Sequence, residues 1–294
     1  MKQKLLQLYK VHYKKLTVFS FVLLALCLLT LGAQYARTGE FFQKGISLKG
    51  GISMTIPIDA AVSPDSVESG LAQKFPSADV SVRQVTEGGR PKALIIEAAD
   101  VGREDLIKTL PELGVPLVEG KYSAETMGSS LGSQFFTQTV KAVVFAFILM
   151  SIVVFFTFRS VFRSLFIILA VASDIISTLA VVDLLGVKLS TAGIAALLML
   201  IGYAVDTDIL VTSRVFKQKN GTVFDRIIDA MRTGLLMTGT AITASIVGLI
   251  FAQSDTVKQI MLIITIGLVF DMIYTWFQNA GILRWYLEGK NGQA

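Results

Sequence analysis

The sequence has little charge, one cysteine and one histidine in 294 residues. Charged residues make up 17% of the chain, against about 25% in soluble domains. Cys27 cannot form a disulfide within the chain, and His12, the only histidine, lies in a basic tail. The sequence also shows no metal-ligand cluster and no phosphate-binding Gly-x-x-x-x-Gly-Lys loop. We therefore expect no catalytic residues, no metal, no cofactor and no enzymatic activity.

Apolar residues are abundant, at 53% of the chain, and they come in blocks. A membrane-spanning helix needs about 20 mostly apolar residues. Six segments have this length and composition: 16–33, 135–157, 164–186, 189–211, 234–252 and 260–283. The first is longer than the apolar core of a signal peptide and lacks a clear cleavage site, so we expect an uncleaved helix rather than a signal peptide.

The net charge of +5 would indicate nucleic-acid binding in a soluble protein, but here the basic residues predict membrane topology instead. They gather in both tails and in alternate short loops: Lys2, Lys4, Lys10, Lys14, Lys15, Arg159, Arg163, Arg214, Lys217, Lys219, Arg226, Arg232, Arg284 and Lys290. The opposite short loops offer only Lys188 and Lys258. We therefore expect a multi-pass protein of the cell membrane with cytoplasmic tails at 1–15 and 284–294. The loop over 214–232 fits a positive-inside anchor, or a contact with anionic lipid or a cytoplasmic partner.

Residues 34–134 should form one external domain, because they are rich in acidic residues and lack long apolar blocks. Alternation predicts strands at 51–58, 79–86 and 93–98, and helical spacing predicts helices at 64–75 and 100–113. Glu87-Gly88-Gly89-Arg90 has the composition of a turn, and 117–122 is the expected closing strand. The order βαββαβ predicts a ferredoxin-like α+β fold. Without a nucleophile and base, a binding or force-transmitting domain is expected.

The pair Gly50-Gly51 stands just before the first expected strand. One interpretation is a bend in which a side chain would clash. The other is a functional motif at the junction between the first helix and the external domain.

Four aspartates inside the apolar segments are candidates for proton or ion coupling, because a carboxylate in a bilayer is costly and marks function by default. Asp174 lies about 15 Å into its segment, and Asp271 is also near the middle of its own. Asp206 is closer to the cytoplasmic end and is the leading candidate. Asp208 is the fourth, but a turn of about 200° separates it from Asp206, so the two cannot face one site. Asp183 should lie near the outer surface.

Small and polar residues accompany these carboxylates at helical spacing. We expect Asp174, Asp206 and Asp271 to share a polar interior, and we expect helix packing at Gly202, Gly234, Thr238 and Ser245, where small side chains let backbones approach. The alternative is that the carboxyl groups are hydrogen-bonded packing elements without a coupling role.

The segment Gly202-Tyr203-Ala204-Val205-Asp206-Thr207-Asp208-Ile209-Leu210-Val211-Thr212-Ser213-Arg214 resembles the fourth helix of the SecD/SecF family, a branch of the resistance-nodulation-division superfamily. Residues 45–52 resemble the motif at the start of the family's external domain, and Ser173-Asp174 resembles its His-Asp pair with serine in place of histidine. One helix, an external domain and five further helices resemble the separate, archaeal type of chain in this family. Thr207 and Gly234 stand where bacterial relatives carry an aspartate and an arginine.

This resemblance implies an accessory role in Sec protein export. The implied partners are a SecD-like membrane subunit, the Sec protein-conducting channel, an unfolded exported polypeptide contacted by 34–134, and the lipid bilayer. It also implies that a proton gradient moves the external domain through carboxylates such as Asp206.

Two other functions remain open at this point. A stand-alone transporter of small molecules or lipids is consistent with the superfamily, although such pumps repeat the six-helix unit. An intramembrane aspartyl protease would need two carboxylates that share a proton, but the Gly-x-Gly-Asp and Tyr-Asp motifs of those enzymes do not occur around Asp206 and Asp174.

Overall fold

The computed structural model describes residues 2–58, 62–87, 90–118, 120–218, 221–252 and 254–291. The chain divides into a helical unit, residues 1–43 and 141–294, and a smaller unit, residues 44–140. Each has its own core, and each is described by itself.

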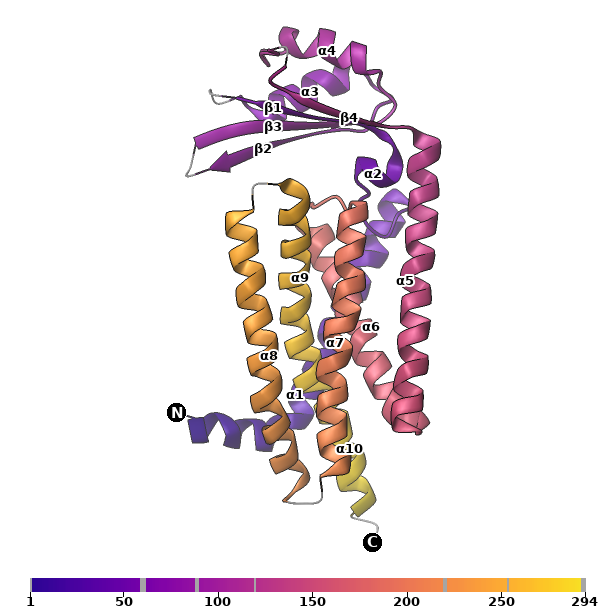
Figure 1. The fold of residues 1–294 in the computed structure, drawn as a ribbon, viewed down its shortest axis with the longest axis vertical. Helices are drawn as coiled ribbons and strands as arrows, with labels where there is room; N and C mark the ends of the chain where they lie inside the picture. Colours follow the sequence, from indigo (N-terminus) through magenta and orange to yellow (C-terminus); the bar gives the residue numbers. More distant parts are fainter. Residues whose placement is uncertain are drawn as a thin grey trace. The chain divides into compact units, whose positions relative to one another are not determined.

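Within the described residues, six helices are long and apolar enough to cross a membrane, as the sequence predicted. They are α1 (Lys2–Thr38), α5 (Ser129–Phe158), α6 (Val161–Leu184), α7 (Thr191–Lys217), α8 (Val223–Phe251) and a sixth made of α9 (Asp255–Ile273), η1 (Tyr274–Asn279) and α10 (Ala280–Asn291) (Figure 1). Most of these helices extend beyond the apolar segments predicted from the sequence. The additional residues at their ends are more polar, so hydropathy alone does not mark them as part of the helix.

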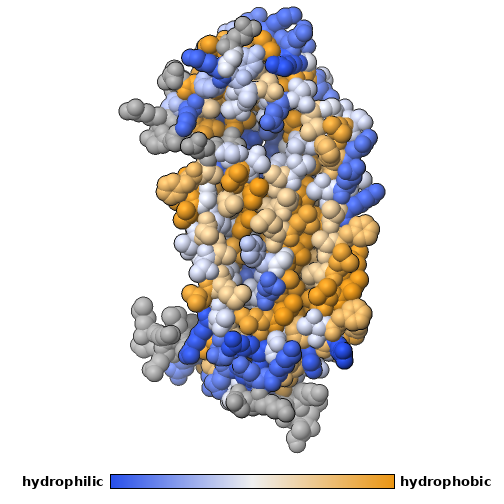
Figure 2. Space-filling view, viewed as in Figure 1, coloured by the Kyte–Doolittle hydropathy of each residue, from blue (hydrophilic) through white to orange (hydrophobic). Residues whose placement is uncertain are grey.

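The centre of the helical unit is formed by α6, α7 and the sixth helix. About half of the most apolar stretch of each is buried inside the structure, against 11% for α1 and α5. Val154 of α5, Ile167 of α6 and Ile201 of α7 meet in one apolar cluster. A second cluster joins α7, α8 and η1. The many exposed apolar side chains gather along this unit, with hydrophilic ones near its ends (Figure 2), as expected for a surface that faces lipid.

The smaller unit is a four-stranded antiparallel sheet with two helices on one face. Its elements are α2 (Ile46–Lys49), β1 (Gly51–Pro57), α3 (Pro64–Lys74), β2 (Val80–Glu87), β3 (Arg90–Ala98), α4 (Arg103–Glu112) and β4 (Ser123–Met127). The strand order is β2-β3-β1-β4, and every neighbouring pair is antiparallel. The βαββαβ order and this sheet agree with the predicted ferredoxin-like fold.

The core of the smaller unit follows the sequence periodicity. Alternate residues of β1, including Met54, point to the helices and are buried. Val67 and Leu71 of α3 and Leu106 of α4 cover them. Pro64 opens α3 directly after the N-cap residue Ser63, whose side chain makes no capping hydrogen bond.

The closing strand differs from the prediction. It runs over Ser123–Met127, not over 117–122. Leu117 and Tyr122 pack against the core from a connecting segment, in which Gly120 has φ +80°. Their burial therefore produced an apolar signal without a strand. The true strand is polar because it is an edge strand, and its position is set by pairing with β1, where Ile52 faces Thr126. The predicted turn at 87–90 falls partly on residues 88 and 89, outside the described residues.

Candidate functional site

Polar side chains gather inside the helical unit although the surrounding helices are apolar. The residues of this group, which we call the buried polar cluster, are at most 4% exposed. They come from five elements: Ser173, Asp174, Ser177 and Thr178 of α6, Thr207, Asp208 and Thr212 of α7, Thr238 of α8, Asp271 of α9, and Tyr274, Thr275, Gln278 and Asn279 of η1. Three of the four candidate aspartates belong to it.

Asp271 is held by two hydroxyl groups from different elements. Thr275 donates to its Oδ1 at 3.0 Å, and Thr238 of α8 donates to its Oδ2 at 3.4 Å. Both carboxyl oxygens therefore have a neutral donor. This carboxyl also links α8 to the sixth helix, and Thr238 thus contributes to helix packing through a hydrogen bond.

Asp208 is held at one oxygen only. The side-chain amide of Asn279 donates to its Oδ1 at 2.7 Å, whereas its Oδ2 is buried without a hydrogen-bond partner. Thr212 lies one helical turn further along α7, and its hydroxyl is also buried and unpartnered. One face of α7 therefore presents two polar groups that the chain itself leaves partly unsatisfied.

Asp174 is fully buried, and no described residue donates a hydrogen bond to either of its carboxyl oxygens. Beside it in the sequence, Ser173 accepts a hydrogen bond of 3.2 Å from the Gln278 amide. Asp174 lies close enough to Asp208 and Asp271 for the three carboxyl groups to interact electrostatically. In the described part of the chain, none of the three forms an ion pair with a basic side chain.

A π-helical turn, η1, brings several of these residues to the interior. Helical turns of this kind are rare and are frequently found at functional sites. The wider turn closes with a bond from the N–H of Ala280 to the carbonyl of Thr275. Five of its six residues are buried, which an ordinary amphipathic helix would not allow. Tyr274 also shares a hydrogen bond of 2.6 Å with Ser177 of α6.

Two side chains of α1 bind to the backbone of this turn. Tyr9 donates its hydroxyl to the carbonyl of Trp276 at 2.7 Å, and Thr17 donates to the carbonyl of Phe277 at 2.8 Å. A Cβ atom added at Gly281 would lie 1.9 Å from the Thr17 hydroxyl, so α1 and α10 approach as closely as glycine permits. The first membrane helix is therefore fixed to the element that carries Gln278 and Asn279.

The structure brings together Asp174, Asp271 and Asp208, not Asp206. Asp206 is exposed, whereas Asp208 is fully buried. The prediction that Asp206 and Asp208 lie on different faces of the helix is correct. Hydropathy alone could not show which of the two faces is buried. The buried face of α7 carries Ala204, Asp208 and Val211, so small and branched residues, rather than overall polarity, mark the packed side.

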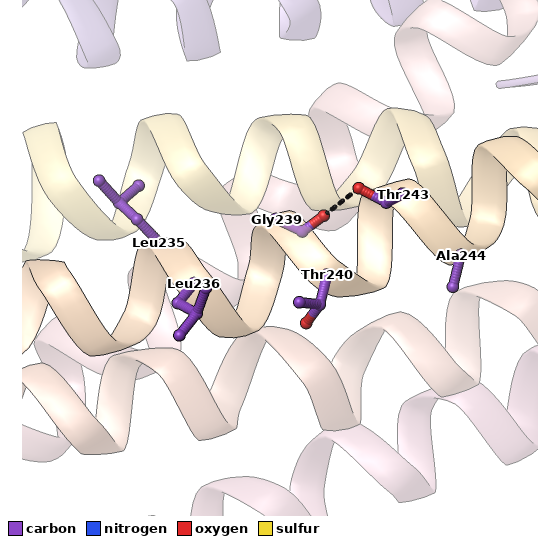
Figure 3. Close-up of a pocket in the computed structure, with 6 residues that line it drawn as sticks. All are labelled: Leu235, Leu236, Gly239, Thr240, Thr243 and Ala244. Carbon is purple, nitrogen blue, oxygen red and sulfur yellow. Dashed lines mark hydrogen bonds between the residues drawn. The ribbon is translucent and has the colours of Figure 1, made fainter.

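The exposed face of α7 also carries Gly202 and Tyr203. Among the described residues, no other part of the chain lies within 4 Å of a Cβ atom added at Gly202, so this glycine does not mark a close approach of two described helices. Its packing role stays a prediction for a contact with another chain. The exposed side of α8 holds an open groove lined by Leu235, Leu236, Gly239, Thr240, Thr243 and Ala244 (Figure 3).

The other predicted packing residues lie between helices. A Cβ atom added at Gly234 would come within 2.5 Å of the Trp276 ring. Ser245 of α8 and Thr265 of α9 share a hydrogen bond of 2.8 Å. Close backbone approach and hydroxyl contacts of this kind join helices that lack a hydrophobic driving force in lipid.

Gly50 and Gly51 both lie in the left-handed region, with φ +88° and +130°. A Cβ atom added at Gly50 would lie 2.3 Å from the Cα of Ser129, and one at Gly51 would lie 2.5 Å from the carbonyl oxygen of Ala98. Gly132 of α5 approaches the backbone of Gly50 in the same way. The two glycines therefore allow a bend in which backbone segments approach closely. A functional role of this junction stays a prediction.

The buried polar cluster can exchange protons or bind a small ion, because it holds carboxyl groups without cationic partners. Within the described residues, no three His, Cys, Asp or Glu side chains converge as a metal site would require. Nucleophilic chemistry of the protease type would also need two carboxyl groups with an accessible reacting atom between them, and Asp206, one of the two residues considered for it, lies outside the cluster.

Residues 116–289 match the family model described as protein export membrane protein SecD/SecF, C-terminal. The protein-export membrane protein SecF of Pyrococcus furiosus is 33% identical over 99% of this chain and 97% of its own length. The SecF of Methanothermobacter thermautotrophicus is 37% identical over 84% of this chain and 85% of its own.

The fold also matches the crystal structure of SecDF, a translocon-associated membrane protein from Thermus thermophilus, with a TM-score of 0.78 at 21% identity. That match covers 96% of this chain but only 38% of the SecDF chain. A second SecDF structure, in the super-membrane-facing form, gives a TM-score of 0.62. Relatives that match over nearly the whole chain, and a family model that covers more than half of it, agree with the motif at 202–214: the chain belongs to the SecD/SecF family of protein-export membrane proteins.

Proposed function

We propose that the chain is an accessory subunit of the Sec protein-export machinery and acts together with a SecD-like subunit. The observation that carries this proposal is its likeness, over nearly its whole length, to relatives named protein-export membrane protein SecF. The chain spans 38% of the SecDF chain that it resembles. A separate SecD-like partner would supply the second helical unit that a SecDF chain contains.

The surface that we assign to this partner includes the exposed face of α7. A carboxylate exposed to hydrocarbon in a membrane helix is costly, by about 2.5–3.5 kcal/mol at the helix centre on insertion scales and by less toward the helix ends. Asp206 is exposed in this chain, and a partner helix with a hydrogen-bond donor or a basic side chain would lower that cost. Gly202 beside it would allow the partner backbone to approach closely.

The groove on α8 supports the same assignment. It combines small residues such as Gly239 with two leucines (Figure 3). The hydroxyl of Thr243 is turned back to the carbonyl of Gly239, at 2.8 Å, so the groove offers apolar and backbone surface rather than free polar groups. Such a surface suits a packed helix better than a polar ligand.

We further propose that the buried carboxyl groups couple export to an ion gradient across the membrane, with the proton as the simplest carrier. Asp174, Asp208 and Asp271 form the internal part of this system, and Asp206 would act at the partner surface. Changes in the charge of the cluster would alter η1 and, through Tyr9 and Thr17, the first membrane helix. Since α1 leads in the chain to residues 44–140, its displacement would move that unit.

The topology belongs to the same proposal. The basic tails and loops favour cytoplasmic termini in the cell membrane, and residues between α1 and α5 would then lie outside. There they would contact an unfolded polypeptide as it leaves the Sec channel. The unit offers two edge strands, β2 and β4, and we assign it a binding role without catalysis.

The first test is purification of the tagged chain from its native membrane in mild detergent, followed by mass spectrometry. Recovery of a larger SecD-like chain, with or without channel subunits, is the expected result. Recovery as a homo-oligomer without either would favour a stand-alone transporter and would contradict the export role.

A photo-crosslinking amino acid tests the assigned surface. Placed at Thr240, in the α8 groove, it should crosslink to the SecD-like partner. Placed at Phe156 of α5, which is 72% exposed, it should crosslink to lipid. Crosslinking to the partner from Phe156 but not from Thr240 would move the interface to α5.

A further inference from the structure

We infer that the first part of α1, residues 2–15, lies along the membrane surface and binds the headgroups of anionic phospholipids through Lys14 and Lys15. This inference goes beyond the proposed export role and depends only on the chain being a membrane protein. It starts from the charge at the end of the helical unit where α1 begins and α10 ends (Figure 1).

That end of the helical unit carries far more basic than acidic residues, and hydrophilic residues gather there (Figure 2). Segments 1–15, 158–163, 214–232 and 284–294 hold fourteen lysine and arginine residues but only three acidic ones. In the described structure, each of these acids already binds another residue of the chain: Asp225 with Thr222, Asp229 with Arg214, and Glu288 with Arg284. The excess positive charge is therefore left for an anion from outside the chain.

Lys14 and Lys15 are exposed where α1 enters its apolar part. Neither forms an ion pair with a described residue. Val18 and Val22, one and two turns further along the helix, are 61% and 51% exposed, as expected of side chains that face lipid. From Leu16 to Thr38 the helix is about 35 Å long, and the hydrocarbon core of a bilayer is about 30 Å thick. The two lysines therefore lie at the level of the headgroup phosphates.

The first turns of α1 do not follow the direction of the bundle. They run across it rather than along it (Figure 1), although the helix is continuous from Lys2. Arg284 of α10 holds this part: its Nη1 atom donates to the carbonyl of Lys10 at 3.0 Å, and its guanidinium carbon lies 3.9 Å from the centre of the Tyr13 ring. A side chain that bonds into the backbone ladder of a helix is a recognised cause of bending. The bend directs these turns along the membrane surface instead of into water.

The inner side of this segment is fixed by contacts with the bundle. Tyr9 donates to the carbonyl of Trp276 at 2.7 Å, and the ammonium group of Lys10 lies 5.4 Å from the centre of the Phe224 ring. On the outer side, Val11 is 68% exposed and lies one helical turn from both lysines. An exposed apolar side chain beside exposed lysines is typical of helices that lie in the interface between headgroups and acyl chains.

Exposed aromatic residues mark the same level on two neighbouring helices. Trp285 of α10 is 65% exposed and lies three residues from Glu288, with which Lys14 interacts electrostatically. Phe162 of α6 is 59% exposed and stacks on Tyr286. Tryptophan and tyrosine are enriched at the level of the headgroups. Aromatic and basic side chains at one level therefore match the chemistry of an anionic headgroup layer.

The test compares the full chain in nanodiscs of phosphatidylcholine with the full chain in nanodiscs that also contain anionic phosphatidylglycerol. Hydrogen exchange is measured in peptides that cover residues 2–15. We expect slower exchange with phosphatidylglycerol, by about five-fold for each lysine that binds, and a smaller difference at high salt, which screens the attraction. Equal exchange in the two kinds of nanodisc would overturn the inference.

Variants assign the effect to the two lysines. The double variant Lys14→Gln and Lys15→Gln should lose most of the difference between the two lipids. The double variant Lys108→Gln and Lys121→Gln is the matched control, because it removes the same charge from exposed lysines of the smaller unit, and it should keep the difference. A difference that persists without Lys14 and Lys15, or that the control loses equally, would contradict the assignment.

A protein occupant would give another pattern. If exchange in residues 2–15 slows only when a SecD-like subunit is added, and does not depend on phosphatidylglycerol, this surface is a protein contact and the lipid assignment is wrong. The nanodiscs contain the chain alone, so failure of the export role would leave the expected lipid effect unchanged.

Discussion

Asn279 donates its side-chain amide to Asp208 across 2.7 Å, and neither residue is accessible to solvent. The bond joins the fourth membrane helix to the π-helical turn of the sixth. Among the described residues, the second oxygen of this carboxyl has no hydrogen-bond partner, so Asp208 depends on the bond from Asn279. The contribution of this hydrogen bond to stability can therefore be measured by replacing either residue.

Asn279→Leu should lower the free energy of unfolding by about 1–3 kcal/mol, because it leaves a buried carboxyl group without its donor. The double variant with Asp208→Leu should lose less than the sum of the two single variants, since both remove the same bond. Equilibrium unfolding, with all four proteins in one lipid environment, measures the cycle. Strict additivity would mean that the bond contributes nothing.

The position of Asp208 shows what the sequence could and could not predict. The number of membrane helices, the external unit and the polar faces of α6 and the sixth helix follow from hydropathy and helical spacing. The rotation of α7 does not, because a carboxylate occurs on each of its two faces and only packing decides which one turns inward. The sequence analysis therefore preferred Asp206 for the polar interior, whereas the structure buries Asp208 there.

The π-helical turn is a second feature that periodicity misses. A period of 3.6 residues predicts Asp271, Thr275 and Gln278 on one face, which is correct. It does not predict that Tyr274 and Trp276 are buried as well. The turn makes tertiary hydrogen bonds with α1 and α6, and contacts between helices distant in the sequence leave no local sequence signal.

Gly234→Ala should destabilise the helical unit, because the added methyl group would lie 2.5 Å from the Trp276 ring. Overpacking of this kind typically costs about 1–3 kcal/mol. Gly202→Ala is the matched control on α7, where the added methyl group meets open space. It should leave the isolated chain unchanged or slightly more stable, since alanine favours helix over glycine.

The same pair of variants tests the proposed partner surface. Gly202→Ala should weaken recovery of the SecD-like subunit if a partner helix packs closely on that face. Unchanged recovery of the partner with Gly202→Ala would contradict the assigned partner contact at Gly202. Unchanged unfolding with Gly234→Ala would contradict the close packing of Gly234 against Trp276.

Gly51→Ala should destabilise the smaller unit. Its φ of +130° is unfavourable for alanine, and the added methyl group would lie 2.5 Å from the carbonyl oxygen of Ala98. Gly128→Ala, one residue after β4, is the control because no other part of the chain lies within 4 Å of its Cβ position. Proteolysis that cuts within residues 44–140 should be faster for Gly51→Ala than for Gly128→Ala. Equal rates would show that the backbone at Gly51 adjusts without cost.

Thr17→Val tests the link between the first membrane helix and η1. Valine keeps the shape of the side chain but removes the donor to the Phe277 carbonyl, a loss of about 0.5–1.5 kcal/mol. Because the freed carbonyl belongs to the π-helical turn, hydrogen exchange should rise in peptides that cover residues 274–279. Thr30→Val is the control, since Thr30 donates to the carbonyl of Cys27 within the same helix. If both variants leave exchange in the turn unchanged, α1 does not hold η1, and the route by which the cluster would move residues 44–140 loses its first step.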